Sequence, residues 1–378
     1  MIREAIGKIV SRRNLAAREM EEVMREITER MASPEQVTSF ITALRMKGET
    51  PEEITAAAKV IREKIPRLEG REDVVSLDRE EITVEKETIL NTLNGSTGGT
   101  NIFNVSTATA LIAAGGGLKV AKYGRRSYSP LCGCADVIEA LGINLDMTPT
   151  QLERCLKEVG ICFYYDPLAQ NGLEPIITLR RKIGIRTIFN ILDPLINPAG
   201  AGIQFLGVYD PNLTEAMATV LESLGIRRAL VVHGEDTLDE ISLTGKTKVT
   251  EYQSGRMKSY FIEPEDFGMK KSRLDEIRGG TGKQNADIIL EILRGCPGSK
   301  RDIAVLNAAA AYFIAGKVKD FKEGIELANQ SIDSGKALHI LKRLIEFTQT
   351  ERRYLRNGHE DEMAHRESVR TILDGEIF

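Results

Sequence analysis

The sequence predicts an α/β protein in which a small N-terminal helical domain packs on a larger α/β domain with a mostly parallel central sheet. The first sixty-odd residues carry only helix signals, whereas short β-rich runs alternate with helical segments after about residue 70. Such alternation is typical of a parallel sheet covered by helices on both faces. The length of 378 residues and the hydrophobic content of 42% are sufficient for two domains with buried cores.

Two capping motifs define helices of the first domain. Ser33-Pro34-Glu35-Gln36 is a capping box with proline at the first helical position, and Gly48 ends the helix that it starts. Thr50-Pro51-Glu52-Glu53 starts the next helix with the same device, and Pro66 ends it. We therefore expect a helical domain over residues 1–68.

Two strand–helix units and one alanine-rich helix mark the second domain, which we expect over residues 69–347. "LKVAKYG" precedes "CADVIEALG", "EAMATVLESLG" precedes "RALVVHG", and "DIAVLNAAAAYFIAG" is a helix suited to close packing. The last segment, 348–378, is highly charged, and we expect it to form a C-terminal extension. Its pattern is typical of a solvated helix or frayed tail, with an oligomer contact as the alternative.

Composition restricts the partners and the location of the protein. The formal net charge of −4 provides no basic surface for nucleic acid. No apolar run is long enough for a membrane span, and the N-terminus lacks the apolar core of a signal peptide. The five cysteines show no disulfide framework, which suits a reducing cytoplasm. These features predict a cytoplasmic protein that binds neither nucleic acid nor membrane.

A glycine-rich segment, "NGSTGGTNIFNVST", precedes an apolar helix and predicts a site for a phosphate group. Glycines let backbone N–H groups approach an anion, and the start of the following helix adds a favourable partial charge. The residues expected to bind the anion are Gly95, Thr97, Gly98, Gly99, Asn104, Ser106 and Thr107. The segment matches neither the Walker pattern nor the dinucleotide fingerprint, so an ordinary loop remains the alternative.

Charged residues follow two predicted strands. Lys122, Arg125 and Arg126 lie at the end of the first strand, where ligands bind in open α/β sheets. Asp239 and Glu240 follow a later strand and a turn, and they could hold Mg²⁺ that a phosphorylated ligand completes. From spacing alone, surface cations and a solvated acidic turn remain alternatives.

The positions of the histidines restrict the chemistry. Of the four histidines, none precedes His233, so a histidine base within the glycine-rich half is excluded. Chemistry there depends on positioning, cations and carboxylates. Displacement at the anomeric carbon of a sugar phosphate fits this restriction, because Mg²⁺ and N–H donors stabilise a leaving pyrophosphate without an acid.

Several segments in the same order resemble the anthranilate phosphoribosyltransferase family, which is glycosyltransferase family 3 with a nucleoside-phosphorylase-like fold. They include "ALRMKGETPEEI", "NIFNVSTATALIAAGGGLKVAKYG", "IGIRTIFNILDPLINPA", "FLGVYDP", "VVHGEDTLDEIS" and "LNAAAAYFIAGK". The resemblance covers roughly residues 10–347. It implies Mg²⁺-dependent transfer of ribose 5-phosphate from phosphoribosyl pyrophosphate to anthranilate in tryptophan synthesis, with release of pyrophosphate. It also implies a homodimer, and a helical domain joined by helices from about 165–195.

The resemblance assigns roles to individual residues. Asn104, Ser106, Thr107 and Lys122 correspond to the donor site, and Ser106, Asp239 and Glu240 to the metal site. Arg180 corresponds to the arginine that meets the carboxylate of the acceptor, a pairing that suits a guanidinium. Tyr123, Arg125 and Gln170 complete the expected acceptor site.

The chain departs from the family pattern at the site itself. The donor loop lacks an aspartate and is shortened, Tyr123 and Arg125 replace a histidine and an asparagine, Gln170 replaces a second histidine, and Asp193 replaces a glycine. A hydrogen bond to a charged group contributes about 1.5–3 kcal/mol, so each lost anchor is expected to weaken acceptor binding by one to two decades. The sequence therefore predicts a divergent phosphoribosyltransferase for an aromatic, carboxylated acceptor, anthranilate or an analogue. A non-catalytic binding or regulatory paralogue and an enzyme with another donor are the alternatives.

Overall fold

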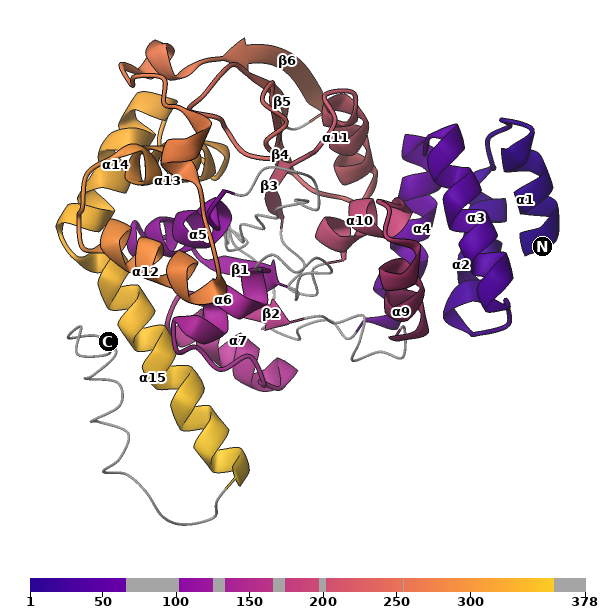
Figure 1. The fold of residues 1–378 in the computed structure, drawn as a ribbon, viewed down its shortest axis with the longest axis horizontal. Helices are drawn as coiled ribbons and strands as arrows, with labels where there is room; N and C mark the ends of the chain where they lie inside the picture. The colour runs from indigo at the N-terminus through magenta and orange to yellow at the C-terminus, as the bar shows by residue number, and fades with distance from the viewer. Residues whose placement is uncertain (66–101, 125–132, 166–173, 197–201, 254, 357–378) are drawn as a thin grey trace, which may run out of the picture.

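The computed structural model describes residues 1–65, 102–124, 133–165, 174–196, 202–253 and 255–356 (Figure 1). The α-helices are α1 (Ile2–Val10), α2 (Ala17–Thr28), α3 (Pro34–Lys47), α4 (Pro51–Lys64), α5 (Val105–Gly115), α6 (Cys134–Ala140), α7 (Pro149–Glu158), α9 (Glu174–Ile183), α10 (Ile188–Leu192), α11 (Leu213–Ser223), α12 (Gly282–Leu293), α13 (Ser299–Ile314), α14 (Phe321–Asp333) and α15 (Lys336–Arg356). The strands are β1 (Val120–Gly124), β2 (Ile161–Tyr165), β3 (Ile203–Gly207), β4 (Arg228–Gly234), β5 (Thr247–Gln253) and β6 (Arg256–Ile262), and the 3₁₀ helices are η1 (Asp193–Leu195), η2 (Pro264–Phe267) and η3 (Leu274–Ile277). Among the described helices, none combines the length and apolar character that crossing a membrane requires.

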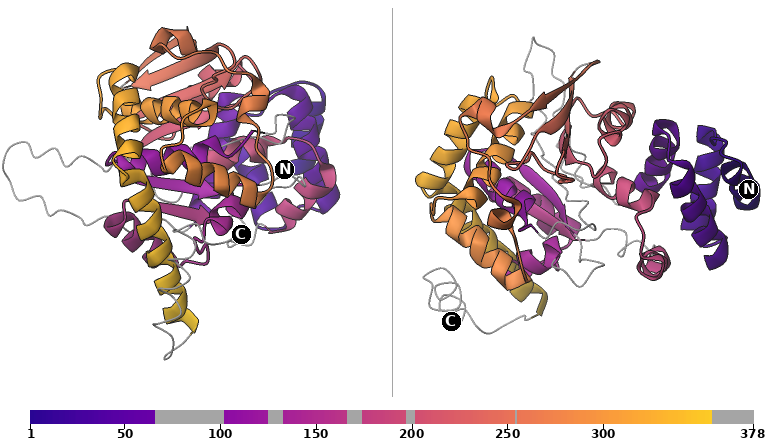
Figure 2. Two further views of the ribbon diagram at one scale, coloured as in Figure 1. Left: turned by 60° about the vertical axis from the view of Figure 1, so that its left-hand side comes forward. Right: turned by 45° about the horizontal axis from the view of Figure 1, so that its top comes forward.

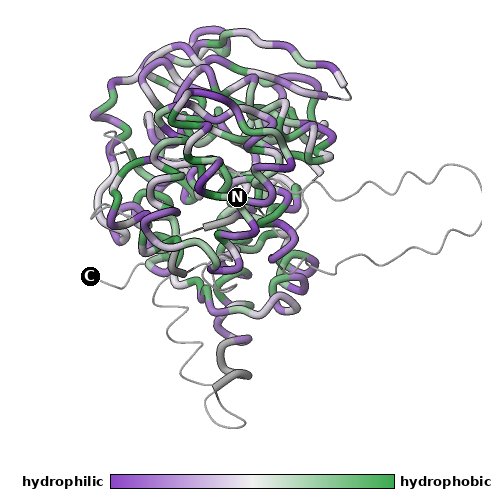
Figure 3. Tube along the Cα trace, turned by 90° about the vertical axis from the view of Figure 1, so that its right-hand side faces the viewer, coloured by the Kyte–Doolittle hydropathy of each residue, from purple (hydrophilic) through white to green (hydrophobic). Residues whose placement is uncertain are grey.

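Helices α3 and α4 begin where local signals place their starts, and α3 also ends at its predicted glycine. The Ser33 hydroxyl accepts from the backbone N–H of Gln36 at 3.3 Å, and the Thr50 hydroxyl accepts from that of Glu53 at 3.2 Å. Gly48 follows α3 with φ of 89°, a conformation that favours glycine. Both predicted capping boxes are confirmed. In Figure 3 this part of the chain faces the viewer, with hydrophilic and hydrophobic stretches alternating along its helices.

The strands form one parallel pair and one mixed sheet. β1 and β2 pair in parallel with Lys122 opposite Phe163, and β3 and β4 also pair in parallel. β5 and β6 extend the second sheet through antiparallel pairing. The α/β class is confirmed, and both predicted strand–helix units are present.

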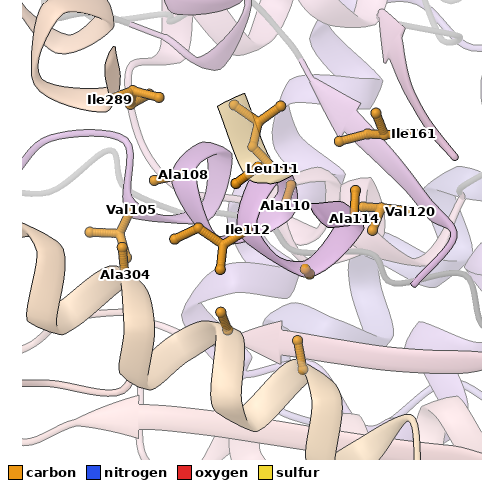
Figure 4. Packing of buried hydrophobic residues seen from close by; sticks show 14 of the residues in the cluster. Val105, Ala108, Ala110, Leu111, Ile112, Ala114, Val120, Ile161, Ile289 and Ala304 are labelled. Carbon is orange, nitrogen blue, oxygen red and sulfur yellow. The ribbon is translucent and has the colours of Figure 1, made fainter. Parts of the chain in front are cut away.

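Helix α5 is the centre of the larger core. All its residues from Val105 to Ala114 are buried, and Figure 4 shows its small and aliphatic side chains between α13, α12 and strands β1 and β2. The Tyr312 hydroxyl of α13 donates to the Ile112 carbonyl at 2.6 Å. A Cβ on Gly116 would lie 2.0 Å from the Tyr312 hydroxyl oxygen, so this close approach requires glycine. The packing fixes the direction of α5 and hence the position of its N-terminus.

The two faces of the β3–β4 pair belong to different hydrophobic cores. Phe205 and Leu230 contribute to the core around α5, whereas Leu206 and Val231 contribute to the core that contains α1–α4. This follows from the alternation of side chains along a strand. The second core also contains residues of α9, α10 and α11, which lie beside α1–α4 in both views of Figure 2. Helix α11 therefore lies between the mixed sheet and the helical domain, since it contacts β4 and β5 as well as α4.

Helix α15 continues past residue 347, where the charged extension was expected to begin. Thr348 is buried, and its hydroxyl accepts from the Asn144 N–H at 3.1 Å. Glu351 accepts from Gln151 at 2.9 Å and pairs with Arg154 at 3.1 Å. Residues 348–351 therefore pack against the α6–α7 region rather than projecting into solvent.

Candidate active site

Asn104 directly precedes α5 and is held by a second buried amide. Its side chain makes no capping bond to the helix; instead, its Oδ1 accepts from Nδ2 of Asn285 at 2.9 Å. Oδ1 of Asn285 in turn accepts from the Gly280 N–H at 2.7 Å. Asn285, which sequence reasoning missed, fixes the orientation of Asn104 at the start of the helix.

Lys122 is a buried lysine at the centre of the site. It lies on β1 with 1% of its surface exposed, and its ammonium donates to the Ser106 hydroxyl at 2.9 Å. Burial lowers the pKa of Lys122, and its neighbours Cys134, Glu240 and Asp239 oppose that shift. The structure therefore brings together Ser106, Lys122 and the acidic pair, which lie far apart in the sequence. The remaining predicted residue of this helix start, Thr107, is buried and lies 3.4 Å from the Cys134 sulfur.

A cross-linked turn carries the acidic pair. Strand β4 ends at Gly234, and the Asp236 carboxylate then accepts from the hydroxyls of Ser242 and Thr244. Thr237 adopts φ of 68°, the left-handed conformation that non-glycine residues seldom take. Asp239 and Glu240 lie within this turn and are 5% and 4% exposed. Hydrogen bonds of the Asp236 carboxylate close the turn, and the backbone of the turn keeps Asp239 and Glu240 in buried positions.

Two residues outside the turn hold its backbone. A Cβ on Gly207, the last residue of β3, would lie 1.6 Å from the Asp239 carbonyl oxygen. On the other side, the buried Asn307 amide accepts from the Ile241 N–H and donates to the Ile241 carbonyl, both at 2.9 Å. Sequence reasoning missed both residues. A usable signal was present for Asn307, since it is the lone amide in the alanine-rich helix.

Asn307→Leu is expected to lower the free energy of unfolding by at least about 2 kcal/mol, because it leaves two buried backbone groups of Ile241 without their partner. Urea denaturation measures the change. Asn329→Leu is the matched control: this helical asparagine is half-buried and accepts one hydrogen bond, from Arg301. Equal losses in the two variants would show that Asn307 has no special role in holding the turn.

An arginine–tyrosine stack connects the acidic pair with the helical domain. The guanidinium of Arg186 lies 4.3 Å from the centroid of the Tyr209 ring, and that of Arg45, on α3, lies 5.4 Å from it. Arg45 also donates to the Tyr209 hydroxyl at 3.0 Å. Burial lowers the pKa of Arg186, and the nearby Asp239 carboxylate opposes the shift. The Asp239 carboxylate therefore favours the charged form of Arg186, an interaction that sequence reasoning missed.

Arg180, the expected acceptor anchor, lies in a buried ion pair. Its two terminal nitrogens donate to the two carboxylate oxygens of Asp193 at 3.3 and 3.0 Å. Each side chain is 3% exposed, and the guanidinium lies 5.8 Å from the centroid of the Phe189 ring. Asp193, the residue at a family glycine position, thus occupies the fork of Arg180.

Other predicted site residues fall outside the described part of the chain. These are Gly95, Thr97, Gly98, Gly99, Arg125 and Gln170. The backbone of Tyr123 belongs to β1, but its side chain is also outside the described set. Their roles stay predictions.

The donor set near Ser106 fits magnesium better than a transition metal. Within the described residues, no three histidine, cysteine, aspartate or glutamate side chains converge on one point. Mg²⁺ is commonly held by one or two carboxylates together with substrate phosphates and water, so the buried pair Asp239 and Glu240 is a sufficient protein contribution. The Nδ1 of the buried His233 lies 2.8 Å from the Val208 carbonyl oxygen, and this contact fixes the orientation of the ring.

Comparison with known families assigns both parts of the chain. Residues 3–65 match the helical bundle domain of a glycosyl transferase family, and residues 92–338 match its α/β domain. The anthranilate phosphoribosyltransferase of Citrifermentans bemidjiense is 49% identical over 348 residues, covering 92% of this chain and 99% of the relative. That of Geotalea uraniireducens is 47% identical with the same coverage.

Solved structures give the same assignment. The anthranilate phosphoribosyltransferase of Thermus thermophilus superposes with a TM-score of 0.80 at 35% identity, covering 91% of this chain and 99% of that one. The enzyme of Saccharomyces cerevisiae in complex with PRPP and Mg superposes with a TM-score of 0.79 at 26% identity, covering 92% and 98%. The fold and nearly the whole length of the chain agree, and the chain belongs to the anthranilate phosphoribosyltransferase family of glycosyl transferases.

Proposed function

We propose that this protein is a Mg²⁺-dependent phosphoribosyltransferase. It moves ribose 5-phosphate from phosphoribosyl pyrophosphate to the amino group of an aromatic acceptor of the anthranilate class and releases pyrophosphate. The observation that supports this best is the buried contact of Lys122 with Ser106 beside Asp239 and Glu240. A buried cation, a hydroxyl and two carboxylates are the groups that a magnesium-bound diphosphate requires.

Each of these groups has a part in the proposed reaction. Asn104, Ser106 and Thr107 present polar groups at the start of α5 to the diphosphate, and Lys122 adds a positive charge to the same group. Asp239 and Glu240 hold the metal, which supplies charge stabilisation to the leaving pyrophosphate when bound. No acid is required for that leaving group, so the absence of histidine before His233 is consistent with the reaction.

The proposed function also includes roles for further residues, the location and assembly of the protein, and its division into domains. Glycines 95, 98 and 99 with Thr97 contact the diphosphate, and Arg180, Tyr123, Arg125 and Gln170 surround the acceptor. The protein acts in the cytoplasm as a homodimer, and with anthranilate as the acceptor its reaction would serve tryptophan synthesis. Residues 1–68, together with the helices of about 165–195, form one domain against the α/β domain of 69–347. The joint core of α1–α4 with α9 and α10 supports this division.

The direct test is pyrophosphate release from phosphoribosyl pyrophosphate with Mg²⁺ and a panel of aromatic amines that includes anthranilate. We expect acceptor-dependent release that stops when EDTA removes the metal and returns with added Mg²⁺. Calorimetry of donor binding accompanies the assay. Absence of turnover with every acceptor, together with absence of donor binding, would refute the proposal.

Lys122→Met is expected to weaken donor binding by one to two decades while the melting temperature stays the same or rises. A charge-assisted hydrogen bond contributes about 1.5–3 kcal/mol to the bound state, whereas burial disfavours the charge of this lysine in the free protein. Calorimetry and thermal melts measure the two effects. Lys119→Met, just ahead of β1 and only partly buried, is the control that should leave donor affinity unchanged. Loss of stability without loss of affinity would contradict the assigned role.

A further inference from the structure

The ion pair between Arg180 and Asp193 has the geometry of a bound carboxylate ligand. Both carboxylate oxygens of Asp193 accept from the two terminal nitrogens of one guanidinium, at 3.3 and 3.0 Å. The two terminal nitrogens of a guanidinium form a planar fork, and this fork can pair in the bidentate mode with only one carboxylate at a time. The side chain of Asp193 therefore fills the position that the carboxylate of an acidic small molecule would take.

Displacing Asp193 is unfavourable because the pair is buried. Each partner is 3% exposed, so a carboxylate that lost Arg180 would stay in a poorly solvated place without its counter-ion. A ligand acid would also lose its own hydration on entry. An uncharged ligand does not displace Asp193 from Arg180 and has no charge to desolvate. The Arg180–Asp193 pair is neutral as a whole and stays intact when such a ligand binds.

Strand β3 connects the pair with the turn that carries Asp239. The Pro194 carbonyl, next to Asp193, accepts from Gln204 at the start of β3 at 2.7 Å. Three residues further, Gly207 meets the Asp239 carbonyl. At about 3.3 Å per residue, the stretch of β3 from Gln204 to Gly207 is about 10 Å long.

We propose that Asp193 is a specificity-determining residue that shifts the acceptor from aromatic acids to uncharged aromatic amines. This inference rests on the proposed function, and it selects within the acceptor class named there. Asp193 does not take part in the transfer step; it acts through Arg180, by occupying the guanidinium that would attract an acidic acceptor.

The test compares anthranilate with 2-aminobenzamide, which has the same ring and amine but an uncharged amide in place of the carboxylate. We expect the native enzyme to show a kcat/KM for 2-aminobenzamide that is roughly tenfold or more above that for anthranilate. Asp193→Gly should reverse the order, mainly through a lower KM for anthranilate. An interaction of a charged group lost or gained in a site changes affinity by about tenfold to a hundredfold.

Two further variants separate specificity from stability. Asp193→Asn keeps the size and removes the charge, and should show the same reversal as Asp193→Gly. Glu53→Gln removes the negative charge of another buried ion pair, in the helical domain. Glu53 pairs there with Lys47 at 2.9 Å, and the two side chains are 0% and 4% exposed, respectively. This substitution is expected to lower the melting temperature without changing the acceptor ratio. Anthranilate should raise the melting temperature of the Asp193 variants more than that of the native protein, because it refills the fork of Arg180.

The outcomes distinguish this inference from the proposed function. If the native enzyme prefers anthranilate, and Asp193→Gly and Asp193→Asn leave the ratio unchanged, the inference is wrong and the phosphoribosyltransferase proposal stands. If donor binding is absent in calorimetry, the proposed function fails first. If the donor binds but turnover is too slow to measure, calorimetry of the two acceptors with the donor complex replaces the rates. The ratio of the affinities for 2-aminobenzamide and anthranilate, in the native protein and in the Asp193 variants, then tests the inference.

Discussion

Asp239→Asn combined with Glu240→Gln is expected to reduce kcat/KM for phosphoribosyl pyrophosphate by about a thousandfold or more, because it removes both charges that hold Mg²⁺. The amides have nearly the same size as the carboxylates, so the turn closed by Asp236 should persist. Steady-state rates at a series of Mg²⁺ concentrations measure the effect. The melting temperature is expected to stay the same or rise, since two buried like charges are removed.

Asp302→Asn is the matched control for this double variant. Asp302 is a carboxylate on α13 whose pKa burial raises, but it lies outside the proposed metal site. Its substitution should leave the dependence of the rate on Mg²⁺ unchanged. A double variant that retained the native dependence on Mg²⁺ would place the metal elsewhere and leave the acidic pair as a structural feature of the turn.

The sequence predicted those structural elements that depend on interactions between residues close together in the chain. Capping boxes at Ser33 and Thr50 define helix starts because the bonds that form them join residues three apart. The grouping of Lys122 with Asp239 and Glu240 was also predictable, since they follow or end strands of an α/β sheet, where ligand-binding groups gather. The resemblance to a known family then gave these residues their expected roles.

Features that depend on tertiary packing could not be predicted in the same way. The partner of Arg180 lies thirteen residues away and was noticed only as a departure from the family pattern. Nothing local indicates that Gly207 and Asn307 meet the turn of the acidic pair from opposite sides, because those contacts depend on how β3 and α13 pack. The antiparallel strands β5 and β6 were likewise not foreseen, since strand order is set by pairing rather than by the pattern within each strand.

Gly207→Ala is the strongest test of whether the turn, and not only its carboxylates, is part of the active site. The added Cβ would lie 1.6 Å from the Asp239 carbonyl oxygen. Cβ atoms in proteins essentially never approach another heavy atom closer than 3.0 Å, so the separation is about 1.4 Å too small. Because the atom in the way is backbone, the turn itself must move. Overpacking of this kind costs about 1–3 kcal/mol of stability. A displacement of about 1 Å in a catalytic group lowers rates by about a hundredfold.

Measuring both the stability and the activity of Gly207→Ala distinguishes a displaced Asp239 from a general loss of folding. Gly245→Ala is the control, because a Cβ there meets nothing within 4 Å. Thermal melts give the loss of stability, and rates measured well below the melting temperature give the loss of activity in the folded protein. A hundredfold lower kcat/KM with a higher requirement for Mg²⁺ would follow from a displaced Asp239. A folded variant with native Mg²⁺ dependence would mean that the carboxylates tolerate a shift of their backbone, and that the contact between Gly207 and Asp239 serves packing alone.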